Sequence, residues 1–98
     1  MFVVMNRFTI HPGKNAEFEG RWRTRQSHLG GVPGFEKFRL LKQDDTHYSS
    51  YAEWASAEAF QAWTTSEAFR KAHGRGAPPG VIDGPPRLEC WEVVLDEE

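Results

Sequence analysis

The chain has 98 residues, enough for a single domain spanning 1–98, and carries a formal charge of −2 at pH 7. This charge provides no basic field for nucleic acid, and no stretch approaches the roughly 20 apolar residues that cross a bilayer. Cys90 is the one cysteine, so no internal disulfide forms, which favours a reducing, cytoplasmic location. Asn6 and Arg7 interrupt the N-terminal apolar run, so we expect no signal peptide.

Apolar spacing along the chain predicts alternating strands and helices. In chain order we expect a strand over 2–10, a helix over 15–29, strands over 35–41 and 48–54, short helices over 56–63 and 64–73, and a strand over 87–95. Ser56 and a capping box over 64–67 mark the starts of the two short helices. Segment 74–86, rich in glycine and proline, predicts one long irregular loop.

This order of elements, β-α-β-β-α-β, predicts an α+β, ferredoxin-like fold in which helices cover one face of an antiparallel sheet. Apolar residues also occur on the face that the helices would leave uncovered. Packing two such faces together buries them, so we expect a homodimer, in the form of a dimeric α+β barrel.

Asn6 and Trp63 are two of three unusual residues at core-facing positions. Asn6 interrupts a strand face formed by Phe2, Val4 and Phe8. A buried amide is costly unless its groups are hydrogen-bonded, so Asn6 either bonds a neighbouring loop or faces a bound ligand. Trp63 follows Phe60 on the first short helix, where a tryptophan is more often core than site.

His73 is the third, and it ends an amphipathic helix four residues after Phe69, on the same stripe. It is either a solvent-exposed capping histidine or a ligand to a metal or haem iron. No second ligand stands at the spacing of a protein-only zinc site. One histidine is sufficient for haem, which needs a single axial ligand from the protein.

Arg25 falls on the apolar stripe of the first helix, at helical spacing from Phe18, Trp22 and Leu29. It has no acidic residue within one turn. An unpaired guanidinium beside apolar side chains suits a carboxylate or phosphate, although simple extension into solvent is as plausible.

Together these segments resemble the IsdG-type haem-degrading monooxygenases of the antibiotic biosynthesis monooxygenase superfamily. The resemblance covers nearly the whole chain and is carried by Asn6-Arg7, Pro33-Gly34-Phe35, residues 18–25 (FEGRWRTR), residues 54–63 (WASAEAFQAW) and residues 66–73 (SEAFRKAH). The joint presence of Asn6, Trp63 and His73 is its most specific part.

The resemblance implies that His73 is the axial ligand of haem iron and that Asn6 hydrogen-bonds an iron-bound ligand on the opposite side. It implies that Trp63 distorts the porphyrin and that Arg25 lies near the propionates. Haem would be both cofactor and substrate, and O2 and an external electron donor, a reductase or a small-molecule reductant, would be required. Two other functions remain open: a cofactor-free monooxygenase acting on a polyketide-like aromatic, and a haem-binding or haem-sensing protein without turnover.

Overall fold

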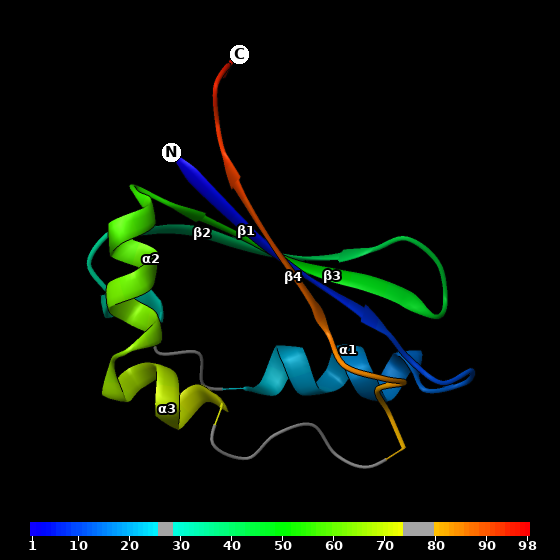
Figure 1. Ribbon diagram of the computed structural model, residues 1–98. Coiled ribbons are helices and arrows are strands. Elements are labelled where there is room, and N and C mark those ends of the chain that lie inside the picture. The colour runs from blue at the N-terminus through cyan, green and yellow to red at the C-terminus, as the bar shows by residue number, and fades with distance from the viewer. Residues whose placement is uncertain (26–28, 74–79) are drawn as a thin grey trace.

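The computed structural model describes residues 1–25, 29–73 and 80–98, with the backbone alone for Ala72 and His73. Its elements are β1 (Phe2–Thr9), α1 (Asn15–Thr24), the 3-10 turn η1 (Leu29–Gly31), β2 (Phe35–Lys42), β3 (His47–Trp54), α2 (Ala57–Thr64), α3 (Glu67–His73) and β4 (Arg87–Glu92). The strands form one antiparallel sheet in the order β2-β3-β1-β4, and the helices lie on one face of it (Figure 1). The predicted ferredoxin-like α+β fold is therefore confirmed.

Side chains of β1 alternate between the two faces of the sheet, as strand geometry requires. Phe2 contacts Phe60 of α2 with ring centroids 6.0 Å apart, and Phe8 contacts Phe18 of α1 at 5.5 Å. Even-numbered residues of β1, including Asn6, therefore face the helices, and odd-numbered residues face away from them.

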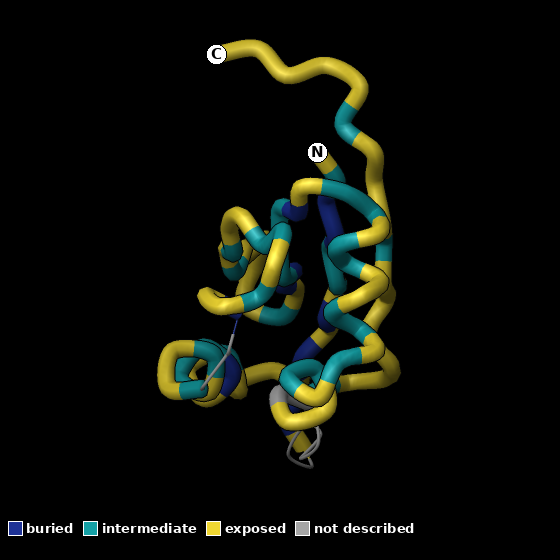
Figure 2. Tube along the Cα trace, turned by 90° about the vertical axis from the view of Figure 1, so that its left-hand side faces the viewer, coloured by how far each residue is buried: buried dark blue, intermediate teal, exposed yellow. Residues whose placement is uncertain are grey.

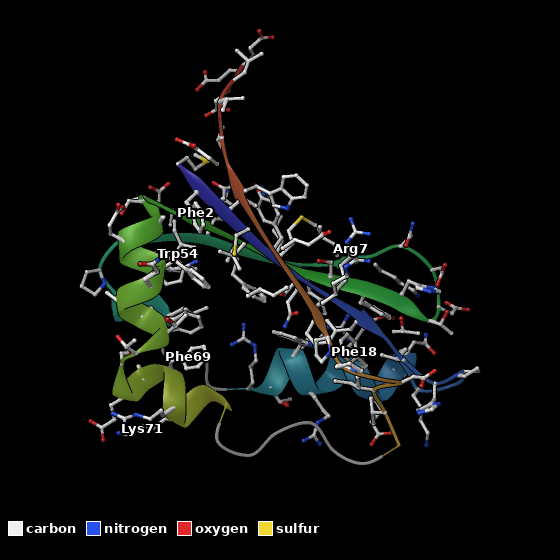
Figure 3. All side chains as sticks on the ribbon, in the orientation of Figure 1. Phe2, Arg7, Phe18, Trp54, Phe69 and Lys71 are labelled. Atoms are coloured by element: carbon white, nitrogen blue, oxygen red, sulfur yellow. The ribbon has the colours of Figure 1, made fainter. Side chains whose placement is uncertain are left out.

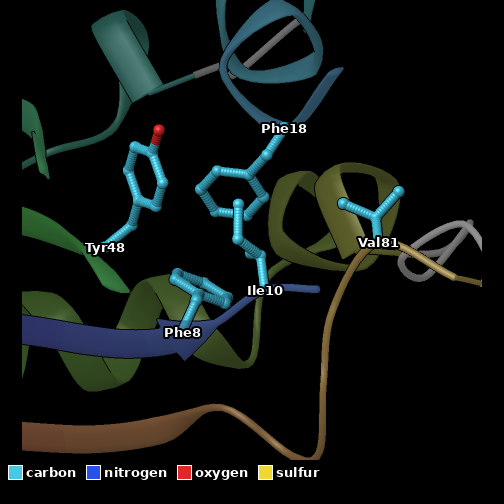
Figure 4. Packing of buried hydrophobic residues seen from close by; sticks show 5 residues of the cluster. All are labelled: Phe8, Ile10, Phe18, Tyr48 and Val81. Atoms are coloured by element: carbon cyan, nitrogen blue, oxygen red, sulfur yellow. The ribbon is translucent and has the colours of Figure 1, made fainter. Parts of the chain in front are cut away.

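Two hydrophobic clusters fill the space between the sheet and the helices. The first, here called the α1 cluster, consists of five buried residues: Phe8, Ile10, Phe18, Tyr48 and Val81 (Figure 4). The second, the α2 cluster, has a buried centre of Val4, Leu29 and Trp54. Half-buried apolar residues surround that centre: Phe2, Val32, Phe35, Phe38, Ala52, Ala59, Phe60 and Trp63.

The helix predicted to reach residue 29 is shorter in the structure. Helix α1 ends at Thr24, and Arg25 has an extended backbone with φ −70° and ψ 151°. The Thr24 hydroxyl donates a hydrogen bond to the Gly20 carbonyl at 3.0 Å, a local bond that favours helix ends over helix interiors. Leu29 belongs to the separate turn η1, and 26–28 lie outside the described residues.

The two short helices begin close to their predicted starts. Ser56 caps α2 as expected, because its side-chain oxygen accepts a hydrogen bond from the Ala59 amide at 3.1 Å. For α3 the capping residue is Ser66, which accepts from the Phe69 amide at 3.2 Å, rather than Thr64 at the head of the predicted capping box. No helix in the described part of the chain is long and apolar enough to span a membrane.

The predicted loop over 74–86 is in part an ordered component of the core. Val81 is only 2% exposed, and Ile82 forms an antiparallel bridge with Ile10. Gly80 takes up a positive φ of 85°, which other residues rarely adopt, just before the chain enters this bridge. Cys90 is exposed on the edge strand β4.

Two large apolar side chains are exposed on the face of the sheet that the helices leave uncovered. Trp91 pairs with Val3, and Leu41 pairs with Ser49, so both lie on the uncovered face of the sheet. They are 52% and 38% exposed. After β4, the Val93 amide bonds the Met1 carbonyl at 3.0 Å, and the chain beyond it projects into solvent (Figure 2).

Candidate functional site

A polar pair interrupts the apolar helix face of the sheet, between the α1 and α2 clusters. The strand register places Asn6 opposite Ser50 of β3 on one side and Leu88 of β4 on the other. Asn6 and Ser50 are both half-buried. On the helix face of β1, the neighbours of Asn6 are Val4 of the α2 cluster and Phe8 of the α1 cluster. The predicted position of Asn6 on the helix face is therefore confirmed.

Small side chains lie beside Asn6 on the neighbouring strand β3. Ala52 pairs with Val4, and Ser50 pairs with Asn6, so β3 carries small side chains at these two positions of the helix face. Aromatic residues flank these positions on both sides. Trp22 and Phe38 stack at 5.5 Å on the side of α1, and Trp54 and Trp63 lie 5.4 Å apart on the side of α2. The helix face between the two clusters thus carries two polar side chains, Asn6 and Ser50, with aromatic rings on either side. We call this surface the aromatic-walled floor. It is suited to a flat, mostly apolar ligand.

Arg25 lies at the edge of this floor, where its backbone leaves α1. Its guanidinium carbon is 4.7 Å from the centroid of Trp22 and 4.6 Å from that of Phe38. Burial lowers the pKa of Arg25 from its usual range because the charged form is partly desolvated. Its buried Nε has no hydrogen-bond partner within the described residues.

The prediction that Arg25 lacks a local acid is thus confirmed, although the helical spacing that suggested it ends one residue earlier. The guanidinium packs against two rings and its Nε is buried, although the residue as a whole is only half-buried. A planar cation fixed in this way is organised to receive an anionic group, which would also replace part of the lost solvation.

Trp63 packs within the α2 cluster. Its ring is 4.8 Å from that of Phe69 in a T-shaped contact, and it also contacts Trp54 and Phe60. Figure 3 shows Trp54 and Phe69 at one end of the helix face, with Phe18 at the other. Trp63 is only half-buried, so part of its surface remains accessible.

His73 is the last residue of α3, and its side chain lies outside the described part of the structure. Phe69 stands one turn before it and packs on Trp63, so α3 is attached to the α2 cluster. The contact between Phe69 and Trp63 therefore helps to fix where α3 lies over the sheet. Among the described residues, no group of three His, Cys, Asp or Glu side chains could hold a metal ion.

A separate cavity of about 290 Å³ opens between α1 and strands β2 and β3. It is lined by Glu19, Trp22, Arg23, Phe38, Leu40, Lys42 and Tyr48, and by neither Asn6 nor Trp63. The Tyr48 hydroxyl donates to the Glu19 carboxylate at 2.5 Å, which lowers the pKa of Glu19. Lys42 and Arg23 also contact this carboxylate, so the charged groups of the cavity largely satisfy one another.

Sequence patterns alone did not identify Ser50 or the Glu19–Tyr48 contact. Tyr48 and Glu19 are 29 residues apart, and their meeting depends on how α1 packs over β3. Ser50 could be placed on the face of Tyr48 and Trp54 by strand alternation. Its pairing with Asn6 required the register of β1 and β3.

Comparison with known proteins agrees with this architecture. The family model for antibiotic biosynthesis monooxygenases matches residues 1–75. The chain belongs to the antibiotic biosynthesis monooxygenase family. A relative in this family, the mycobilin-producing heme oxygenase of Mycobacterium tuberculosis (strain ATCC 25618 / H37Rv), is 36% identical over 96% of this chain and 90% of its own length.

Two further comparisons support the predicted resemblance. The staphylobilin-producing heme oxygenase of Staphylococcus haemolyticus is 34% identical over 74% of this chain and 73% of its own length. The heme-degrader MhuD from Mycobacterium tuberculosis, solved with two hemes bound in its active site, is 33% identical and superposes with a TM-score of 0.81. That comparison covers 100% of both chains. The resemblance to haem-degrading monooxygenases is therefore confirmed.

Proposed function

We propose that this chain is a haem-degrading monooxygenase that binds haem and opens its porphyrin ring with O2 and external electrons, releasing iron. Arg25 carries the proposal: a half-buried guanidinium packed against the rings of Trp22 and Phe38, with no partner for its Nε among the described residues, at the edge of an aromatic-walled floor. Haem has the complementary form, a flat apolar ring with carboxylates on one edge. Relatives named as heme oxygenases at 34–36% identity support the same function.

Four residues have proposed roles. His73 is the axial ligand of the iron, and Asn6 donates a hydrogen bond on the opposite side of the ring. Trp63 presses on the porphyrin and forces it out of plane, and Arg25 binds a propionate. Haem supplies the iron that activates O2 against its own ring, so it is substrate as well as cofactor. The residues of the protein bind it, orient it and exclude water.

We also propose that the chain forms a homodimer through the uncovered face of the sheet. Trp91 and Leu41 expose apolar surface there, beside ion pairs of Arg7 with Glu89 and Arg39 with Glu53. A second copy presents the same patch and can bury both. Further proposals are a cytoplasmic location and a reductase or small-molecule reductant as the electron donor.

The test is a haemin titration followed by reduction in air. We expect a shifted Soret band on haemin addition, then loss of that band with iron release after ascorbate is added. A stable band under ascorbate would instead identify a haem-binding or sensing protein. The absence of any Soret shift would contradict haem binding and favour a cofactor-free monooxygenase of an aromatic substrate.

One variant tests the axial ligand in the same assay. His73→Ala is expected to lose the shifted Soret band while circular dichroism shows a folded protein, because the residue ends a helix. If the variant keeps the Soret position and intensity of the parent, another residue ligates the iron.

A further inference from the structure

Ser50 is a polar residue on the helix face of the sheet, and none of the roles proposed above involves it. It pairs directly with Asn6 across β3 and β1, on the face that the helices cover. Opposed residues in an antiparallel pair have Cβ atoms roughly 4.5–5.5 Å apart. The Ser50 hydroxyl and the Asn6 amide can therefore reach the same small group above the sheet.

The structure assigns neither side chain a partner among the residues that it describes. Within the described residues, no hydrogen bond engages the side chain of Asn6 or Ser50, although both are half-buried. Half-buried polar groups on an otherwise apolar face normally have partners. A ligand that contacts one of them is positioned to contact the other.

Ser49, the preceding residue, shows what a structural serine does in this strand. It lies on the opposite face, is 9% exposed, and donates its hydroxyl to the Ser50 carbonyl at 2.8 Å. Its polar group is satisfied locally, so it needs no ligand. The contrast between two adjacent serines separates a hydroxyl used by the fold from one that the fold leaves available.

We propose that Ser50 is a second hydrogen-bond donor to the small ligand that occupies the distal axial position of haem, beside Asn6. This inference rests on the proposed haem-binding function. Two donors at fixed separation hold such a ligand in one direction over the ring, whereas a single amide would allow it to rotate. Ser50 is thus a residue that determines the orientation of the distal ligand.

The experiment uses two replacements of equal shape. Ser50→Thr keeps the hydroxyl and Ser50→Val removes it, and both residues suit a strand. The full chain is loaded with haemin, and cyanide affinity is measured in the ferric form. In the ferrous form, the stretching frequency of bound carbon monoxide is recorded. Ser49→Thr and Ser49→Val provide the matched pair on the opposite face, and circular dichroism confirms folding.

We expect Ser50→Val to raise the cyanide Kd roughly 2- to 10-fold, the effect of losing one ordinary hydrogen bond. The carbon monoxide frequency should rise in the same variant, while Ser50→Thr and both Ser49 variants match the parent. Identical values for Ser50→Thr and Ser50→Val on haem-loaded protein would overturn the role of Ser50 alone. A parent chain that shows no Soret shift with haemin would overturn the proposed function together with this inference.

Discussion

The α1 and α2 clusters are built from the same kinds of residues but differ in how completely they are buried. All five core members of the α1 cluster are at most 7% exposed, including Phe18 and Tyr48 at 3%. In the α2 cluster, three residues reach this level, and Phe60 and Trp63 remain half-buried. The α1 cluster has three half-buried apolar neighbours, Trp22, Leu40 and Ile82, and the α2 cluster has eight, so a larger share of the α2 cluster remains partly exposed. In this sense we call the α1 cluster closed and the α2 cluster open.

This difference separates stability from binding within one small core. A chain of about 100 residues buries roughly two-thirds of its unfolded surface, so it has little apolar surface to leave uncovered. The α1 cluster joins α1, β1, β3 and the segment at Val81 into a rigid unit. The α2 cluster presents aromatic surface that a flat ligand would cover. Ligand binding should therefore stabilise the folded chain, because the ligand binds the folded state and not the unfolded one.

The most direct test of the comparison removes one phenylalanine from each cluster. Phe18→Ala is expected to lower the free energy of unfolding by about 3–5 kcal/mol, because it empties a fully buried site. Phe60→Ala should cost about 1–2 kcal/mol, since its ring is half-buried. Urea unfolding of the haem-free protein measures both.

Phe18→Leu serves as the milder variant if Phe18→Ala does not fold. Equal costs at the two positions would show that the α2 cluster is as important for stability as the α1 cluster, and the distinction between them would fail.

Replacing Trp63 tests whether the open cluster acts on the ligand. Trp63→Phe should retain part of the haem-degrading activity, and Trp63→Ala should bind a flatter haem and lose most turnover. Because removing a packed tryptophan can cost about 3–5 kcal/mol, rates are compared only on haem-loaded protein that is folded by circular dichroism. If folded Trp63→Ala degrades haem at the parental rate, Trp63 is a core residue and not a distorting one.

How far the sequence predicts this fold depends on whether an interaction is local. Strand alternation, the Ser56 cap and the capping box over 64–67 placed the strands and the two short helices within three residues. The end of α1 at Thr24 was missed, because the apolar spacing continues past the residue at which a threonine hydroxyl bonds back to the helix. Val81 was missed because a glycine- and proline-rich composition predicts turns but not which apolar residue between them becomes buried.

For the candidate site the limit is the same. Asn6 was located by its strand position, and Arg25 by its missing acid, both local properties of the sequence. The cation–π contacts of Arg25 with Phe38, and the pairing of Asn6 with Ser50, join residues far apart in the chain. Such contacts follow from strand register and helix packing, which one sequence does not specify.

The role of Arg25 is tested on haem affinity. Arg25→Met removes the charge but keeps an apolar side chain against Trp22 and Phe38. We expect haem Kd to rise roughly 10-fold or more, the loss of a charge-assisted hydrogen bond. The haem Kd of Arg25→Lys should lie between those of the parent and Arg25→Met, because lysine keeps the charge without the planar stacking.

Arg21→Met is the control for Arg25, since Arg21 lies four residues earlier, on α1, and is exposed. Equal haem affinities for the parent, Arg25→Met and Arg21→Met would exclude an interaction of Arg25 with a propionate.

The smallest expected effect concerns Tyr48, in the closed α1 cluster. Burial and the hydrogen bond to Glu19 raise its pKa to about 12. In the unfolded chain this hydroxyl titrates near pH 10. Between about pH 10 and about pH 12 the folded state therefore holds a proton that the unfolded state has lost, and stability falls as pH rises. Tyr48→Phe removes this component, so its urea midpoint should fall less than the parental one between about pH 8 and about pH 11. Haem affinity near neutral pH should not change, because Tyr48 lies outside the floor between the clusters. Midpoints that decline in parallel would show that Tyr48 does not remain protonated in the folded chain, and a lost haem affinity would show that the two ends of the helix face are coupled.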